Sequence, residues 1–179
     1  MFDKLKKILS NREVVLKIMI TFGLLLAFKA GTYIPIPLFD TTQVEGIFEE
    51  ANFFGILNAF SGGGLSNYSI LALGISPYIT ASIVVQLLQM VLPSLKELSE
   101  QGESGKQKLN RITRYFAIGL AFIQGFGLIL GLSYGAQGNQ LIPSITDPNI
   151  FYYVYMALAI TGGTAFSIFI GDLITKKGI

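Results

Sequence analysis

Apolar residues gather in four long stretches of the 179-residue chain, and most charged side chains lie between these stretches. The stretches run over about 14–34, 70–92, 114–134 and 150–174. Each is close to the roughly 20 apolar residues that an α-helix needs to cross a bilayer. Prolines follow the first two, and proline cannot continue a helix in the usual way. The pattern predicts an all-α membrane protein, a polytopic helical bundle whose membrane domain covers residues 14–179.

The basic residues are divided unevenly among the segments that join these stretches. Of the 13 lysines and arginines, only Lys29 falls toward one side of the predicted membrane. The others precede or begin the first stretch, lie in or beside the connection between the second and third, or close the chain. Because basic segments stay on the cytoplasmic side, both termini are predicted to be cytoplasmic.

Residues 1–13 have a pattern of their own. Phe2, Leu5, Ile8 and Leu9 recur at helical spacing among lysines, which is typical of an amphipathic helix on the membrane surface. A frayed tail is the alternative interpretation. A signal peptide would need a small-residue cleavage site, and none is clear after the first apolar stretch.

Composition narrows the class of protein further. Hydrophobic residues make up 51% of the chain and charged residues 13%, against roughly 25% charged in soluble proteins. Mean hydropathy is +0.58. The sequence has no cysteine and no histidine, so it lacks thiolate chemistry, the commonest general base and the commonest metal ligand. We therefore expect no enzyme activity, no cofactor and no bound metal.

An uncharged stretch from Ala51 to Leu95 is the most informative feature of the sequence. Residues 53–60 are apolar, and Ser61 with three glycines at 62–64 interrupts the pattern. A helix of that length reaches only part of the way into a bilayer, and irregular backbone at membrane depth requires a protein or water-filled environment. The segment therefore predicts a re-entrant element of a channel or carrier. An outer helix lying flat on the membrane remains the alternative.

The second apolar stretch contains unusual residues for a membrane span. Pro77 is expected to remove the donor from a carbonyl near Leu73. Gln86 should face protein or water instead of lipid. Ile75 and Ile79 lie one turn apart, which fits ordinary helix packing or an apolar constriction that excludes ions by dewetting.

The third and fourth stretches offer weaker signals. Glycines at 127, 131 and 135 form a ridge that would permit close helix contact, and Gln124 is a candidate for a hydrogen bond between helices. Small residues at 161–164 also predict tight packing. We expect Asp172 to be solvated, and the connection 93–113 to be a solvated loop or a docking surface for an acidic or RNA-containing partner.

Four segments together resemble the SecY family of protein-conducting channels. They read GTYIPIPLFD, FSGGGLSNYSILALGISPYITASIVVQLL, GESGKQKLNRITRY and GDLITKKGI. The resemblance extends in order over nearly the whole chain. It implies the N-terminal part of a ten-span bundle, whose two pseudo-symmetric halves close like a clamshell around a re-entrant plug.

The resemblance also implies roles for individual residues. The plug would be about 58–66, with these members: Asn58, Phe60, Ser61, Gly62, Gly63, Gly64 and Leu65. Ile75 and Ile79 would belong to the pore ring. The lateral gate, through which signal sequences leave into lipid, would include Thr80, Ile83, Gln86 and Gln124.

The partners implied by the resemblance are the SecE and SecG subunits, the SecA motor ATPase or the ribosome, and signal sequences of secreted proteins. The location implied is the bacterial plasma membrane. The remaining part of the channel would have to come from elsewhere, so we expect this chain alone not to support translocation. A secondary transporter with discontinuous helices is the alternative, although no predicted span has a carboxylate at its centre.

Overall fold

The computed structural model describes residues 12–37, 52–135 and 150–178, and the regular structure in these ranges is helical. The predicted surface helix at 1–13 lies almost entirely outside the described residues. Six helices follow in chain order: α2 (Arg12–Gly31), α3 (Asn52–Phe60), α4 (Ser76–Val91), α5 (Pro93–Glu100), α6 (Glu103–Gly135) and α7 (Ile150–Lys177).

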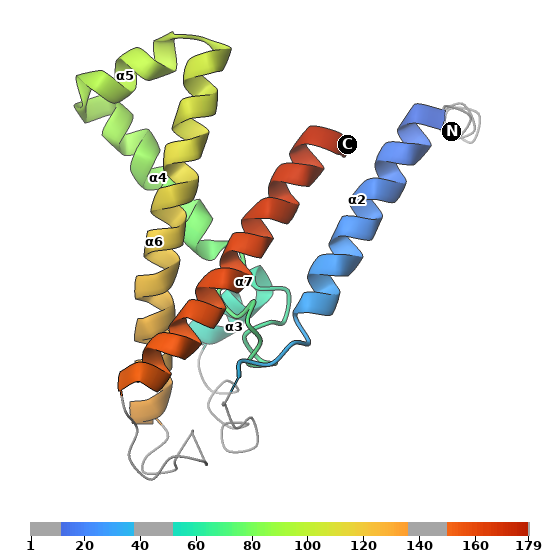
Figure 1. The fold of residues 1–179 in the computed structure, drawn as a ribbon, viewed down its shortest axis with the longest axis vertical. Helices are drawn as coiled ribbons and strands as arrows, with labels where there is room; N and C mark the ends of the chain where they lie inside the picture. Colours follow the sequence, from blue (N-terminus) through green and yellow to red (C-terminus); the bar gives the residue numbers. More distant parts are fainter. Residues whose placement is uncertain (1–11, 38–51, 136–149, 179) are drawn as a thin grey trace.

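Three of these helices are long and apolar enough to cross a membrane. They are α2, α6 over Glu103–Gly131, and α7. They coincide with the first, third and fourth predicted spans. Their directions place the start of α2, the end of α7 and the connection from α5 to α6 at one end of the molecule (Figure 1). The segments that carry most of the basic residues therefore share one end, as the charge pattern predicts.

The second predicted span is helical only in part. The prediction of a helix from residue 70 is wrong, because residues 70–75 form turns and α4 begins at Ser76. The end of the span is as predicted: α4 stops at Val91, and Leu92 is extended with φ −95° and ψ 112°. A proline disfavours helical backbone in the residue before it. The chain bends by 102° between α4 and α5, and together these two helices are long and apolar enough for a broken span or a re-entrant loop.

The predicted solvated loop 93–113 is also helical. Pro93 sits in the first turn of α5, where its missing N–H costs nothing. A turn at Gly102, with φ 72°, leads directly into α6. Gly105 packs against the Leu98 carbonyl at a distance that leaves no room for a side chain. The prediction of a loop rested on the mixed charges of this segment. Charged residues do not prevent helix formation, and here they belong to two amphipathic helical segments.

The largest helix contact joins α6 and α7. Every fourth residue along α6 is buried, in the series Leu109, Thr113, Ala117, Ala121, Gly125 and Ile129. Most are small, so the backbones can approach closely. A four-residue step turns about 40° around a helix axis, and the buried stripe thus passes from α4 and α5 at one end toward α7 at the other. Its last residue, Ile129, packs with Met156, Ala157 and Ile160 of α7.

The predicted glycine ridge is not part of this contact. A side chain added at Gly127 or Gly131 would meet nothing within 4 Å, and both residues are exposed. Gly125, two residues away, is the glycine that faces Ile160. The four-residue spacing of the ridge suits helix packing, but the residues that α6 buries at this spacing lie on another face of the helix.

Candidate functional site

The candidate site is the turn segment 61–75 between α3 and α4, together with the exposed faces of these helices. Four hydrogen bonds tie residues 67–70 of the segment to Gly31, the last residue of α2, and to residues 32–36 that follow it. The Ile36 amide donates to the Tyr68 carbonyl (2.7 Å) and the Ile70 amide to the Ile34 carbonyl (3.0 Å). The Ser69 hydroxyl donates to the Gly31 carbonyl (2.9 Å) and the Asn67 side chain to the Thr32 carbonyl (3.2 Å). This part of the segment is therefore anchored to α2.

The same segment is wedged against α7. Leu71 is fully buried and lies between two glycines, Gly31 of α2 and Gly163 of α7. A side chain on Gly163 would collide with the Ile70 carbonyl, whereas one on Gly162 would meet nothing within 4 Å. The predicted tight packing at 161–164 thus holds for Thr161, Gly163 and Thr164, which are buried, and not for the exposed Gly162.

The glycines after α3 have specific conformations. Gly62 has φ 64°, its amide donates to the Ala59 carbonyl, and the Gly63 amide donates to the Asn58 carbonyl. This is the Schellman arrangement, which ends a helix with a left-handed residue, usually glycine. Gly64 is buried, and a side chain there would lie 2.8 Å from the Leu71 carbonyl oxygen.

The predicted plug residues divide into two groups. Phe60 is 53% exposed, and Asn58 is half-buried at the end of α3. Ser61 and Leu65 are buried in the anchored turn, where the Ser61 hydroxyl accepts from the Leu65 amide (3.0 Å). The exposed end of α3 and the fixed turn after it therefore have different surroundings.

Lys29 joins this region to α2. Its ammonium donates to the Gly62 carbonyl (3.0 Å) and lies 5.3 Å from the centre of the Tyr33 ring. The sequence reasoning used Lys29 only to orient the chain. Its isolation from the other basic residues was the signal that could have indicated a specific contact.

Ile75 and Ile79 lie at the start of α4. Ile75 is the residue before the first helical turn, and its carbonyl accepts from the amides of Tyr78 and Ile79. The Ile75 side chain approaches Gly171 of α7, and Ile79 is 39% exposed. The prediction that Pro77 leaves the Leu73 carbonyl without a donor is wrong. Pro77 sits in the first turn of α4, and the Ser76 amide donates to that carbonyl (3.1 Å).

The predicted lateral-gate residues do not form one cluster. Thr80 and Ile83 are exposed on α4, and the Thr80 hydroxyl donates to the Ser76 carbonyl (3.2 Å). Gln86 donates to the Ser82 hydroxyl on the same helix (3.3 Å). Gln124 lies half-buried on α6, about three turns beyond Thr113, the part of α6 that Gln86 faces across a pocket.

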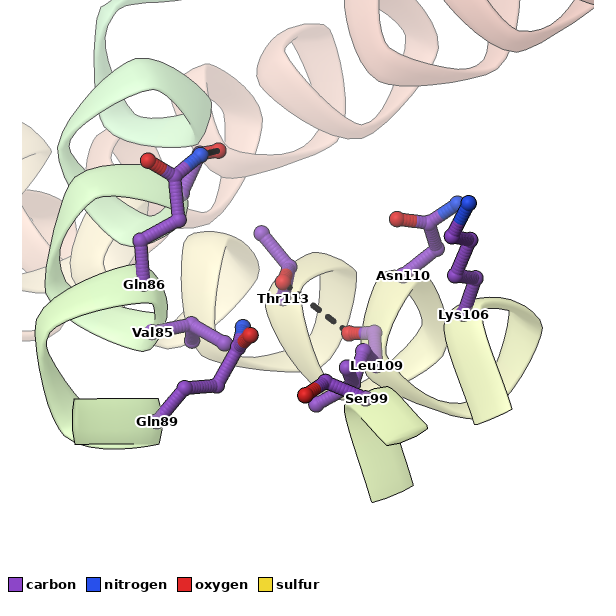
Figure 2. A pocket seen from close by; sticks show the side chains of 9 residues that line it. Val85, Gln86, Gln89, Ser99, Lys106, Leu109, Asn110 and Thr113 are labelled. Carbon is purple, nitrogen blue, oxygen red and sulfur yellow. Dashed lines mark hydrogen bonds between the residues drawn. The ribbon is translucent and has the colours of Figure 1, made fainter. Parts of the chain in front are cut away.

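The pocket has a volume of about 320 Å³ and lies between α4, α5 and α6. Figure 2 shows Gln86 and Gln89 on α4 across from Asn110 and Thr113 on α6. Lys106 is the only charged residue of its lining, which also contains Ser82, Val85, Ser99 and Leu109. Amide and hydroxyl groups give this end of the helix pair a polar interior.

An ion pair joins α6 and α7 at the same end. Arg114 Nη1 lies 2.9 Å from Asp172 Oδ2, and their side chains are 35% and 25% exposed. The expectation that Asp172 is solvated is therefore wrong. Its partner comes from a helix distant in the sequence, so position along the chain could not reveal the pair. Within the described ranges, no three His, Cys, Asp or Glu side chains gather as metal ligands.

Comparison with known proteins identifies the family. The SecY family model matches residues 69–179. The protein translocase subunit SecY of Bacillus licheniformis is 44% identical over 180 residues, and that of Halalkalibacterium halodurans is 43% identical over 181 residues. The corresponding subunit of Staphylococcus carnosus is 42% identical over 180 residues.

These alignments include the whole of this chain but only 40–41% of each relative. The chain thus spans about two fifths of the length of the curated relatives that it matches. The family match agrees with a helical, multi-pass bacterial membrane protein, and it includes the last part of the anchored turn from residue 69, α4 and both of the long helices α6 and α7. The chain belongs to the SecY family.

Proposed function

We propose that this chain forms the N-terminal part of a Sec protein translocation channel, with both termini in the cytoplasm. Such a channel passes unfolded secretory polypeptides and releases signal or transmembrane segments into the membrane. Support comes from the family match, from the three helices long and apolar enough to span a membrane with the bent pair of α4 and α5, and from the shared end of the basic segments. The SecY name of the relatives refers to a protein translocase subunit.

The observation that carries the proposal is the junction between the anchored turn and α4. Irregular backbone is tolerated at membrane depth where protein buries it or water reaches it. Residues 61–75 meet that condition through their bonds to α2 and their contact with α7. Directly after this turn, Ile75 and Ile79 present branched side chains that are only partly covered.

In the proposed channel each element has a separate task. The Ile75 and Ile79 side chains belong to an apolar ring that fits loosely around a passing chain and excludes ions by dewetting. The end of α3, with Phe60, closes the outer side of this ring at rest. Thr80, Ile83 and Gln86 on α4, with Gln124 on α6, belong to the lateral gate.

The proposed channel also requires partners. SecE, SecG and the remaining channel spans would complete the enclosure, and SecA or the ribosome would dock at the end formed by α5 and the start of α6. That motor must provide the energy, because the chain has no GxxxxGK[ST] phosphate-binding motif.

The test is ion conductance of the complete channel in planar bilayers. Replacing Ile75 and Ile79 together with glycine should raise the resting conductance several-fold, because the wider apolar constriction becomes wetted. Leu87→Gly is the matched control, since Leu87 is 56% exposed on the same helix and lies outside the proposed ring. Equal conductance in the double variant and the unchanged channel would rule out the ring assignment.

A further inference from the structure

We propose that Lys29 is a positioning residue that holds the end of α3 against α2 while the channel is at rest. The inference rests on the proposed role of α3 as the plug. It adds a specific contact that keeps this element in place, made by the basic residue that the charge pattern separates from all the others.

The contact is directed at the terminus of α3. The Lys29 ammonium donates to the Gly62 carbonyl at 3.0 Å, and Gly62 is the left-handed residue of the Schellman arrangement. A cation near a helix C-terminus also interacts favourably with the helix dipole. The Tyr33 ring, 5.3 Å from the ammonium, lies near enough to hold the lysine side chain over this site.

α3 has few other ties to the rest of the described chain. Of its side chains that the structure describes, Gly55, Ile56, Ala59 and Phe60 are exposed, and Asn58 is half-buried. The hydrogen bonds of Asn58 go to the turn that immediately follows, at Ser61, Gly63 and Ser66. Among the hydrogen bonds of the described residues, the bond from Lys29 is the one that joins residues 52–63 to α2.

The anchored turn is held in place independently of the Lys29 bond. Four hydrogen bonds fix residues 67–70 of the turn to residues 31–36 at the end of α2. The Leu71 side chain fixes the same part of the turn to α7. Gly62 and Gly63, with φ 64° and 89°, lie between that fixed part and α3. Breaking the lysine contact would therefore loosen the end of α3 from α2, while the bond from the Ser66 amide to the Asn58 side chain and the close approach of Gly74 to the Phe60 carbonyl still limit its movement.

The experiment uses the complete channel in lipid bilayers with a single cysteine at Phe60. This chain contributes no cysteine of its own, so the label is unique once the other subunits are cysteine-free. In the proposed channel the apolar ring covers the end of α3 at rest, so the rate of alkylation by a charged, water-borne thiol reagent reports how often this end leaves its resting position. Resting ion conductance is recorded on the same variants without the cysteine.

Lys29→Met removes the charge and keeps the length of the side chain, and we expect alkylation to become about three- to tenfold faster, the effect of losing one partly exposed charged hydrogen bond. Lys29→Arg should stay close to the unchanged protein because it retains a charged donor. Lys17→Met is the matched control, since Lys17 lies on the same helix toward its opposite end.

The outcomes separate the contact from the function. Faster alkylation with raised conductance supports both the contact and the plug. Faster alkylation with unchanged conductance supports the lysine contact and counts against α3 as the seal. Equal alkylation rates for Lys29→Met and the unchanged protein would overturn the proposal, as would an equal acceleration by Lys17→Met. Tyr33→Leu provides a second test. It removes the ring beside the ammonium, and we expect alkylation to become faster by less than in Lys29→Met.

Discussion

The contact of α6 with α7 and the outer face of α4 are both apolar, yet one is buried and the other is open. On α7, half of the most apolar part of the helix is buried inside the protein. On α4, the buried residues are Pro77, Ala81 and Val85, while Ile83, Leu87 and Met90 are exposed. Small residues, and not hydrophobicity, distinguish the buried face, because lipid satisfies large apolar side chains as well as protein does.

The buried contact provides support, and the open face of α4 carries proposed functional residues. The small-residue stripe of α6 and the glycine of α7 at 163 build a fixed support for the anchored turn. The open face of α4 begins where that support ends, and it carries four of the proposed ring and gate residues, Ile79, Thr80, Ile83 and Gln86. A channel needs both properties, since a gate helix that were packed on every side could not release a signal sequence.

The largest expected effect breaks the fixed support. Gly163→Ala places a methyl group against the Ile70 carbonyl, which is backbone and cannot move aside easily. We expect a loss of about 3 kcal/mol in unfolding free energy, measured by denaturation of the purified protein in mild detergent or nanodiscs. Gly162→Ala is the matched control, because open space surrounds it. Equal stability of the two variants would show that the close approach of α7 to residue 70 is not needed.

The next effect tests the open face of α4. A photo-crosslinking side chain at exposed Thr80 should capture a signal sequence about ten times more efficiently than one at Ala81, which is fully buried against Ala117 and Ile168. The yield is measured with a radiolabelled preprotein arrested in the complete channel. Ile83, exposed on the same helix, provides a second position. Failure at both exposed positions would remove α4 from the exit route.

A smaller effect concerns the ion pair beside this support. Arg114→Met leaves Asp172 without its partner, and we expect a loss of about 1 kcal/mol, because both side chains are partly exposed and water screens the pair. The measurement is a double-mutant cycle with Asp172→Asn. If the two single changes add exactly to the double change, the pair contributes no coupling between α6 and α7.

The sequence predicted three spans and the element after residue 52 because long apolar runs and glycine breaks depend on local chemistry. The start of α4 was missed, since residues 70–75 are as apolar as the helix that follows and their turns depend on contacts with α2 and α7. The contact made by Lys29 and the pairing of Arg114 with Asp172 were missed for the same reason: each joins residues that lie far apart in the chain.

The site residues themselves came from the resemblance, and the pattern alone left Ile75 and Ile79 open between packing and a pore. The structure adds their partial exposure and their place directly after the anchored turn. It separates Gln124 from Gln86, although the resemblance assigns both residues to the lateral gate. A shared role in the gate does not require Gln86 and Gln124 to lie close together, because residues on two spans can line one route at different depths.

The smallest expected effect compares a packed and an open face of one helix, α6. Gly127 and Gly125 lie two residues apart on α6, but only Gly125 faces α7. Gly127→Ala should raise the unfolding free energy by a few tenths of a kcal/mol up to about 1 kcal/mol, since alanine favours a helix and meets nothing there. Gly125→Leu should lower it by about 2 kcal/mol, because the larger side chain has no space beside Ile160. Denaturation of both variants under one set of conditions gives the comparison. A loss of stability in Gly127→Ala would mean that the exposed ridge is covered by a partner helix in the complete channel or between copies of this chain, and the boundary drawn here between packed and open faces would move accordingly.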